Sequence, residues 1–183
     1  MRVLGLSGSL RSGSHNSQLL RAAAELLPPG TELVEFEDLK AIPPFDEDDE
    51  HSFPEPVLAL HEAVADADAV LISTPEYNHS LPGQLKNALD WLSRPSGQSP
   101  VRGKPAAVVG ATTGLFGAVW AQAEGRKVLA AMGAHVVDSE LPVGQAHDAF
   151  TPDGALADPD LETAYGDLLA QLTDRAPALS AAA

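Results

Sequence analysis

Apolar residues along this chain form two kinds of pattern that alternate. Short continuous runs occur within 2–6, 68–73 and 105–110, and such runs are typical of strands buried inside a parallel sheet. Between them, leucines and alanines recur at helical spacing, which predicts amphipathic helices. Strands that alternate with helices indicate an α/β fold, in which helices cover both faces of a parallel sheet.

The pattern defines five strands and five helices. The predicted strands are 2–6, 31–36, 68–73, 105–110 and 134–137, and the predicted helices are 16–27, 57–67, 81–92, 118–132 and a last one that begins at 159. We expect Ser80 to be the N-cap of the third helix, with Pro82 in its first turn. We expect 138–157 to be irregular, 1–175 to form a single domain, and the alanine-rich tail 176–183 to be disordered.

Glycines, hydroxyl residues and one arginine follow the first strand. A strand, a Gly/Ser-rich turn and a helix make a cradle for an anion, because the first amides of a helix have no partner within it. A guanidinium adds donors that match phosphate oxygens. The candidates for holding one phosphate are Ser9, Arg11, Ser14, Asn16 and Ser17. The alternative is an ordinary Gly/Ser loop with a solvated arginine.

The spacing of this stretch excludes several known phosphate and nucleophile motifs. A Walker motif needs G-x-x-x-x-G-K-[ST], and the nearest stretch, 97–105, has one residue too many and ends in proline. The glycines at 5, 8 and 13 do not fit the dinucleotide fingerprint G-x-G-x-x-G, and no G-x-S-x-G elbow is present. A loop built for one phosphate suits a mononucleotide.

The composition of the chain limits the classes of binding partner that we expect. The net charge of −15 argues against nucleic acid and anionic membranes as partners, and the absence of cysteine excludes disulfide and thiol chemistry. The first strand begins almost at Met1, so we expect no signal peptide and a cytoplasmic location. The acidic run 46–50 offers carboxylates for calcium or magnesium, but its spacing matches no calcium loop and favours a solvated surface loop.

Three loops of unusual composition follow strands one, three and four, at 7–17, 74–80 and 111–117. Parallel sheets bind ligands at the carboxyl ends of their strands, so we expect these loops to meet in one site. In the second loop, Pro75 stiffens the exit from the strand and Tyr77 offers a flat ring. The peptide groups of Glu76, Tyr77 and Asn78 are placed to meet the polar edge of a heterocycle.

Two motifs in these loops resemble those of the flavodoxin-like NAD(P)H-dependent FMN reductases, a group that includes bacterial azoreductases, quinone reductases and chromate reductases. Residues 8–16 match G-S-x-R-x-x-S-x-N, and residues 75–91 match P-E-Y-N-x-S-x-P-x-x-L-K-N-A-x-D-W. The resemblance extends over most of the chain in length and order. It departs from the usual pattern at Ala118, where a second glycine is common, and His79 stands where related chains vary.

The resemblance implies a flavodoxin-like three-layer sandwich with strand order 2-1-3-4-5 and FMN as the cofactor. The phosphate of FMN would be held by Ser9, Arg11, Ser14, His15, Asn16 and Ser17. The isoalloxazine would be lined by Pro75, Glu76, Tyr77 and Asn78, and its other edge would touch Thr112, Thr113 and Gly114. No metal and no catalytic side chain are expected, although Tyr77 would shape the stacking site.

The resemblance further implies hydride transfer from NADPH or NADH through FMN to an acceptor such as a quinone, an azo compound, free flavin or a metal oxyanion. The alternatives are an FMN electron carrier without efficient NAD(P)H turnover and a nonflavin protein that binds a small phosphate ester. Members of the group form homodimers or homotetramers. We expect helix 81–92 near the interface, because Trp91 and Lys86 lie beyond its apolar stripe, although packing is the favoured role of Trp91.

Overall fold

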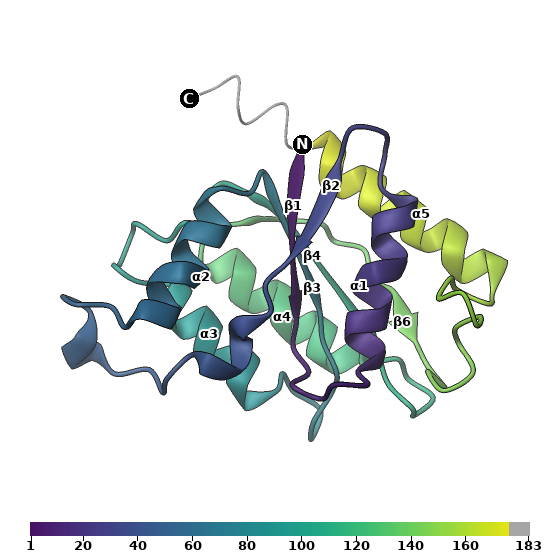
Figure 1. The fold of residues 1–183 in the computed structure, drawn as a ribbon, viewed down its shortest axis with the longest axis horizontal. Helices are drawn as coiled ribbons and strands as arrows, with labels where there is room; N and C mark the ends of the chain where they lie inside the picture. Colours follow the sequence, from purple (N-terminus) through teal and green to yellow (C-terminus); the bar gives the residue numbers. More distant parts are fainter. Residues whose placement is uncertain (176–183) are drawn as a thin grey trace.

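A parallel sheet forms the centre of the computed structural model, which describes residues 1–175 (Figure 1). Its strands are β1 (Arg2–Ser7), β2 (Glu32–Glu35), β3 (Ala69–Ser73), β4 (Pro105–Ala111), β5 (His135–Val136) and β6 (Pro142–Val143). The order β2-β1-β3-β4-β5, with β6 also paired to β4, confirms the predicted topology. The tail 176–183, which we expect to be disordered, lies outside the described residues.

Five α-helices cover the two faces of this sheet. They are α1 (His15–Leu26), α2 (Glu55–Ala65), α3 (Gly83–Leu92), α4 (Val119–Ala131) and α5 (Pro159–Asp174), and the short 3-10 turns η1 (Asp38–Ala41) and η2 (Glu47–Asp49) lie before α2. In Figure 1, α1 and α5 lie on one side of the sheet and α2, α3 and α4 on the other. Each predicted helix is present, with its ends shifted by only one or two residues.

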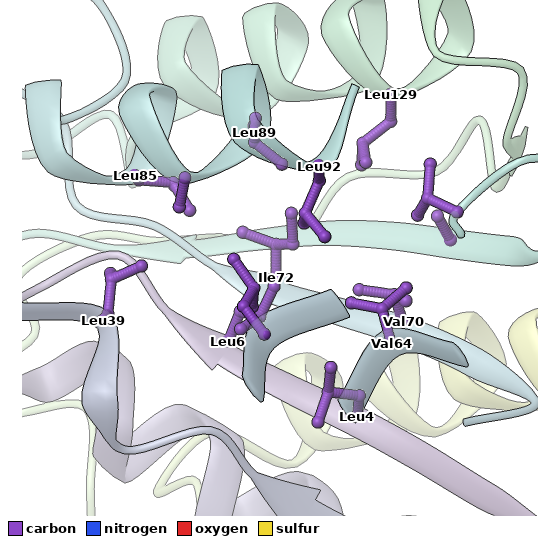
Figure 2. Packing of buried hydrophobic residues seen from close by; sticks show 14 of the residues in the cluster. Leu4, Leu6, Leu39, Val64, Val70, Ile72, Leu85, Leu89, Leu92 and Leu129 are labelled. Carbon is purple, nitrogen blue, oxygen red and sulfur yellow. The ribbon is translucent and has the colours of Figure 1, made fainter. Parts of the chain in front are cut away.

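Side chains of the central strands alternate between two apolar layers. Leu6 of β1 and Ile72 of β3 face α2, α3 and α4, where they pack with Leu85 and Leu89 (Figure 2). Their neighbours in sequence, such as Leu71, face α1 and α5. Because both faces are buried, the central strands appear in the sequence as continuous apolar runs.

Two local predictions are wrong. Ser80 is not a helix cap: its backbone pairs with Tyr77 in a tight turn, and α3 begins at Gly83 with Pro82 at the N-cap position. The stretch 138–157 is not wholly irregular, because it contains β6, which pairs with Gly110 and Ala111. A strand of two residues is too short to produce a periodic signal in the sequence.

Trp91 is fully buried, which contradicts the idea that it projects toward a subunit interface. Its ring makes T-shaped contacts with Phe45 and Phe53, at centroid distances of 4.9 and 5.8 Å, and its Nε1 donates to the Pro43 carbonyl at 2.9 Å. The packing role favoured from the sequence is therefore confirmed. Lys86 is half exposed and pairs with Asp90 on the same helix at 2.6 Å.

The acidic run 46–50 forms η2 on the surface and is attached to the end of α3. Arg94 pairs with Glu47 at 2.9 Å and with Glu50 at 3.0 Å, and its guanidinium lies over Phe45. Within 1–175, no three His, Asp or Glu side chains are grouped as a metal site would require. No helix in the same range combines the length and the apolar character needed to cross a membrane.

We predict that acid destabilises the fold partly through His61. Its Nε2 lies 3.1 Å from the Trp91 carbonyl oxygen, its ring packs on Phe53, and burial lowers the pKa of the imidazole below its ordinary value of 6.5. Because the folded pKa is the lower one, the stabilising contribution is complete above pH 6.5 and is lost as the pH falls toward the folded value. Urea unfolding from pH 8 to pH 5 should show His61→Gln losing less stability than the parent. An equal loss in both proteins would contradict this assignment.

Candidate functional site at the carboxyl edge of the sheet

Three loops meet at the carboxyl ends of β1, β3 and β4: loop 1 (8–14), loop 2 (74–82) and loop 3 (112–118). The amide of Gly8 donates to the Ser73 carbonyl at 2.8 Å. A Cβ at Gly8 would lie 2.9 Å from a methyl of Leu85 on α3 and 3.3 Å from Pro75 of loop 2, so a side chain at this position would force its neighbours to shift. The predicted convergence of the three loops is therefore present in the fold.

The buried side chain of Asn16 joins α1 to the ends of β3 and β4. Its Nδ2 donates to the Ala111 carbonyl at 3.0 Å, and its Oδ1 accepts from the Ala111 amide and the Ser73 hydroxyl, both at 3.0 Å. These contacts use both ends of the amide. Asn16 thus positions the loops and uses one of its two amide N–H donors to do so.

Loop 1 leaves several backbone amides free at the start of α1. Ser14 is the N-cap, and its Oγ accepts from the amides of Asn16 and Ser17 at 3.1 and 3.4 Å. The hydrogen bonds among residues 1–175 leave six amides of this stretch without an acceptor: Ser9, Leu10, Ser12, Gly13, Ser14 and His15. The Nδ1 atom of His15 is also buried without a partner among these residues. Such a concentration of unused donors at a helix N-terminus fits an anion.

The other predicted residues of loop 1 surround this point. Arg11 is exposed, and its Nη2 donates to the Gly13 carbonyl at 2.7 Å, which holds the guanidinium beside the loop. The Oγ of Ser9 accepts from the Arg11 amide at 3.4 Å. Ser17 donates from its hydroxyl to Ser7 at 3.0 Å. The side chain of Ser17 therefore supports the end of β1 as well as lying near the candidate site.

The tip of loop 2 is exposed to solvent. The backbones of Tyr77 and Ser80 pair at 3.1 Å in both directions, and the two residues between them have positive φ angles of 54° and 61°. Positive φ at both central positions is the conformation of a type I′ turn. Tyr77 is 56% exposed and Asn78 is exposed, whereas Pro75 is buried against loop 1.

The side chain of Glu76 points away from this tip and reaches α4. Its Oε2 accepts from the amides of Trp120 and Ala121 at 3.1 and 3.2 Å, and its Oε1 lies 3.5 Å from Nδ1 of His79. The Ser80 hydroxyl donates to Glu124 at 2.5 Å, and this hydrogen bond lowers the pKa of the Glu124 carboxyl. Sequence reasoning assigned only the peptide group of Glu76 to the site and missed its side-chain contacts.

Loop 3 is shaped by residues that leave no room for larger side chains. Gly117 has a φ of +56°, and a Cβ there would overlap the backbone of Pro142. Behind the loop, the fully buried Gln122 donates to the carbonyls of Gly117 and Leu141 at 2.8 and 3.1 Å and accepts from the Leu141 amide at 3.0 Å. Sequence reasoning missed Gln122, although a glutamine within a small-residue helix is the signal that marks it.

The predicted residues of loop 3 lie at its start. Thr112 is half-buried. Its amide donates to the Val143 carbonyl and its carbonyl accepts from the Ala146 amide, both at 3.0 Å. Thr113 and Gly114 are exposed. Large apolar side chains are also exposed on these loops and on the first turn of α4: Leu10, Tyr77, Leu115, Phe116 and Trp120.

Comparison with known proteins places this arrangement among flavin enzymes. Residues 1–148 match the family described as NADPH-dependent FMN reductase. The chain is 46% identical over 160 residues to an NAD(P)H-dependent FMN reductase of Pseudomonas aeruginosa, covering 86% of this chain and 85% of the relative. It is 40% identical over 140 residues to a quinone reductase of Escherichia coli K12, covering 75% and 74%.

A solved structure agrees with these relatives. The fold superposes on FerB, a flavoenzyme NAD(P)H:(acceptor) oxidoreductase from Paracoccus denitrificans, with a TM-score of 0.85 and 34% identity. The match covers 97% of each chain. The similarity therefore extends over nearly the whole chain.

We predict that Gln122→Leu lowers the free energy of unfolding by about 2–3 kcal/mol, because buried backbone groups of Gly117 and Leu141 lose their partner. Gln171→Leu is the matched control, since Gln171 is exposed on α5 and makes one side-chain hydrogen bond with Ser139. That change should stay within about 0.5 kcal/mol of the parent. Similar urea midpoints for both variants would mean that Gln122 does not hold loop 3.

Proposed function

Because the chain belongs to the NADPH-dependent FMN reductase family, we propose that loops 1, 2 and 3 form its FMN site. The protein is an NAD(P)H-dependent FMN oxidoreductase, and the alternative of a carrier without NAD(P)H turnover has no support among its relatives. The observation that carries the assignment of the site is the set of six unused amides at the start of α1. A nonflavin phosphate-ester protein would not need the exposed ring of Tyr77 on loop 2.

The phosphate of FMN would lie at the N-terminus of α1. The free amides of loop 1 and the helix dipole favour a doubly charged oxyanion there. Arg11 adds a cation, and the Ser14 hydroxyl keeps its proton for a ligand because its oxygen accepts from two amides. The buried Nδ1 of His15 is a further partner. Asn16 contributes by fixing the cradle through its contacts with Ala111 and Ser73.

The isoalloxazine would lie over the tip of loop 2. The peptide groups of residues 75–78 supply donors and acceptors to its polar edge, and Tyr77 limits the stacking space beside it. Thr112, Thr113 and Gly114 would meet the other edge from loop 3. Glycine at 114 and threonine hydroxyls at 112 and 113 leave this edge open and polar.

The reaction converts NAD(P)H, a proton and an acceptor such as a quinone into NAD(P)⁺ and the reduced acceptor. When bound, FMN supplies the hydride chemistry, so the protein needs no nucleophilic side chain. We propose quinones as the first acceptors to test, since relatives at 40–45% identity are named quinone reductase or 2-hydroxy-1,4-benzoquinone reductase. We also propose a cytoplasmic location, which suits a cysteine-free chain that uses NAD(P)H.

We predict ping-pong kinetics, because an isoalloxazine held by loops 1, 2 and 3 would leave one face for both substrates. Varied NADPH at several quinone concentrations should give parallel double-reciprocal lines, and NADP⁺ should compete with the quinone. NADH is tested in the same way. Intersecting lines would mean that donor and acceptor occupy separate places, which would overturn the single-face arrangement.

We predict a homodimer or a dimer of such dimers in solution. Trp91 no longer supports this assembly, but Leu115, Phe116 and Trp120 are 73%, 63% and 43% exposed and lie together beside the proposed site. Exposed apolar clusters of this kind mark contact surfaces. Light scattering at micromolar concentration should give at least twice the 19.0 kDa mass of one chain. A Phe116→Ser variant should weaken the assembly, and a monomeric parent would contradict it.

A further inference from the structure

The geometry points to Glu76 as a positioning residue that attaches loop 2 to the N-terminus of α4. Its carboxylate accepts from the amides of Trp120 and Ala121 at 3.1 and 3.2 Å, although 44 residues separate Glu76 from Trp120. Its side chain is only 13% exposed. The contact is thus the N-cap of a helix, supplied by a loop that follows a different strand.

The N-terminus of α4 has no cap of its own. Its N-cap residue, Ala118, has a left-handed backbone with φ 60° and ψ 32° and no side-chain oxygen, and the first turn of the helix contains no acidic residue. A helix N-terminus carries unpaired amides and partial positive charge, both of which a carboxylate neutralises. Glu76 therefore supplies from loop 2 what the sequence of α4 lacks.

Other side chains of loop 2 make contacts with the same helix. The ring of His79 packs edge-on against Trp120 with centroids 4.6 Å apart, and the Ser80 hydroxyl donates to Glu124. Between these anchors, Tyr77 and Asn78 remain exposed. The anchors hold a turn whose two central residues have positive φ, a conformation that asparagine and histidine adopt only at some cost.

The contacts between loop 2 and α4 should affect the affinity for FMN, an inference that rests on the proposed function. The side chains of Glu76, His79 and Ser80 face α4, so the peptide groups and Tyr77 are left to face the ring. Loss of the cap would free loop 2 to move relative to loops 1 and 3. FMN binding would then also have to order loop 2, and this loss of conformational entropy would weaken the affinity.

The test compares Glu76→Gln and Glu76→Ala with a matched cap variant, Asp158→Ala. Asp158 caps α5 by accepting from the Asp160 amide at 2.9 Å, and α5 packs on the face of the sheet opposite to α4. Two quantities are measured on the full chain freed of flavin: hydrogen exchange at the Trp120 and Ala121 amides, and the dissociation constant of FMN from flavin fluorescence quenching. Thermal midpoints are recorded for every variant.

We expect Glu76→Ala to speed exchange at both amides and to weaken FMN binding, each by about tenfold, the size of a typical cap contribution. Glu76→Gln should fall between it and the parent, because the amide oxygen still accepts but carries no charge. Asp158→Ala should lower the thermal midpoint while leaving the FMN dissociation constant unchanged.

Three outcomes would overturn the inference. One is unchanged exchange at Trp120 and Ala121 in both Glu76 variants. Another is faster exchange with an unchanged FMN dissociation constant, and the third is equal loss of FMN affinity in Asp158→Ala, as expected if Glu76 contributed only general stability. If the parent itself does not bind FMN, the proposed function fails, whereas the exchange rates still decide whether Glu76 attaches loop 2 to α4.

Discussion

The buried amide of Asn16 is the contact on which the carboxyl edge of this sheet depends. Pairing between β3 and β4 ends at Ser73 and Val109, and the next β4 residue on that side, Ala111, would have an unpaired amide and carbonyl. The Asn16 side chain forms hydrogen bonds with both of these groups and also accepts from the Ser73 hydroxyl. It thereby replaces the next residue of β3 in the hydrogen-bond ladder. This allows loop 2 to leave the sheet without a buried unpaired group, a penalty of about 1–3 kcal/mol for each such group.

The same edge is supported from its other side by α4. Gln122 holds loop 3 against the segment that precedes β6, and Glu76 connects loop 2 to the first turn of the helix. Polar side chains therefore set the relative positions of all three loops, while the two apolar layers hold the sheet itself. The free amides of loop 1 and the exposed tip of loop 2 remain available for the proposed contacts with FMN.

Sequence reasoning succeeded where the signal is periodic or local. The continuous runs of β1, β3 and β4 and the helical stripes predicted the layers, and the order of strands and loops predicted which loops meet at the carboxyl edge of the sheet. It failed where side chains choose distant partners. Ser80 has the chemistry of an N-cap but pairs with Tyr77 and Glu124, and Trp91 is enclosed by aromatic rings from the segment before α2. The roles of Asn16, Glu76 and Gln122 each depend on at least one partner 19 or more residues away, which no local pattern encodes.

The central claim is that loop 1 and the start of α1 hold the phosphate of FMN. The most direct test is to titrate the flavin-free chain with FMN and with riboflavin, which lacks the phosphate, and to repeat both titrations with Arg11→Ala. We expect FMN to bind about a hundredfold more tightly than riboflavin, since several charge-assisted hydrogen bonds are involved. Arg11→Ala should cost FMN about 1.5–3 kcal/mol and leave riboflavin unaffected. Equal affinities for FMN and riboflavin in the parent would contradict the account.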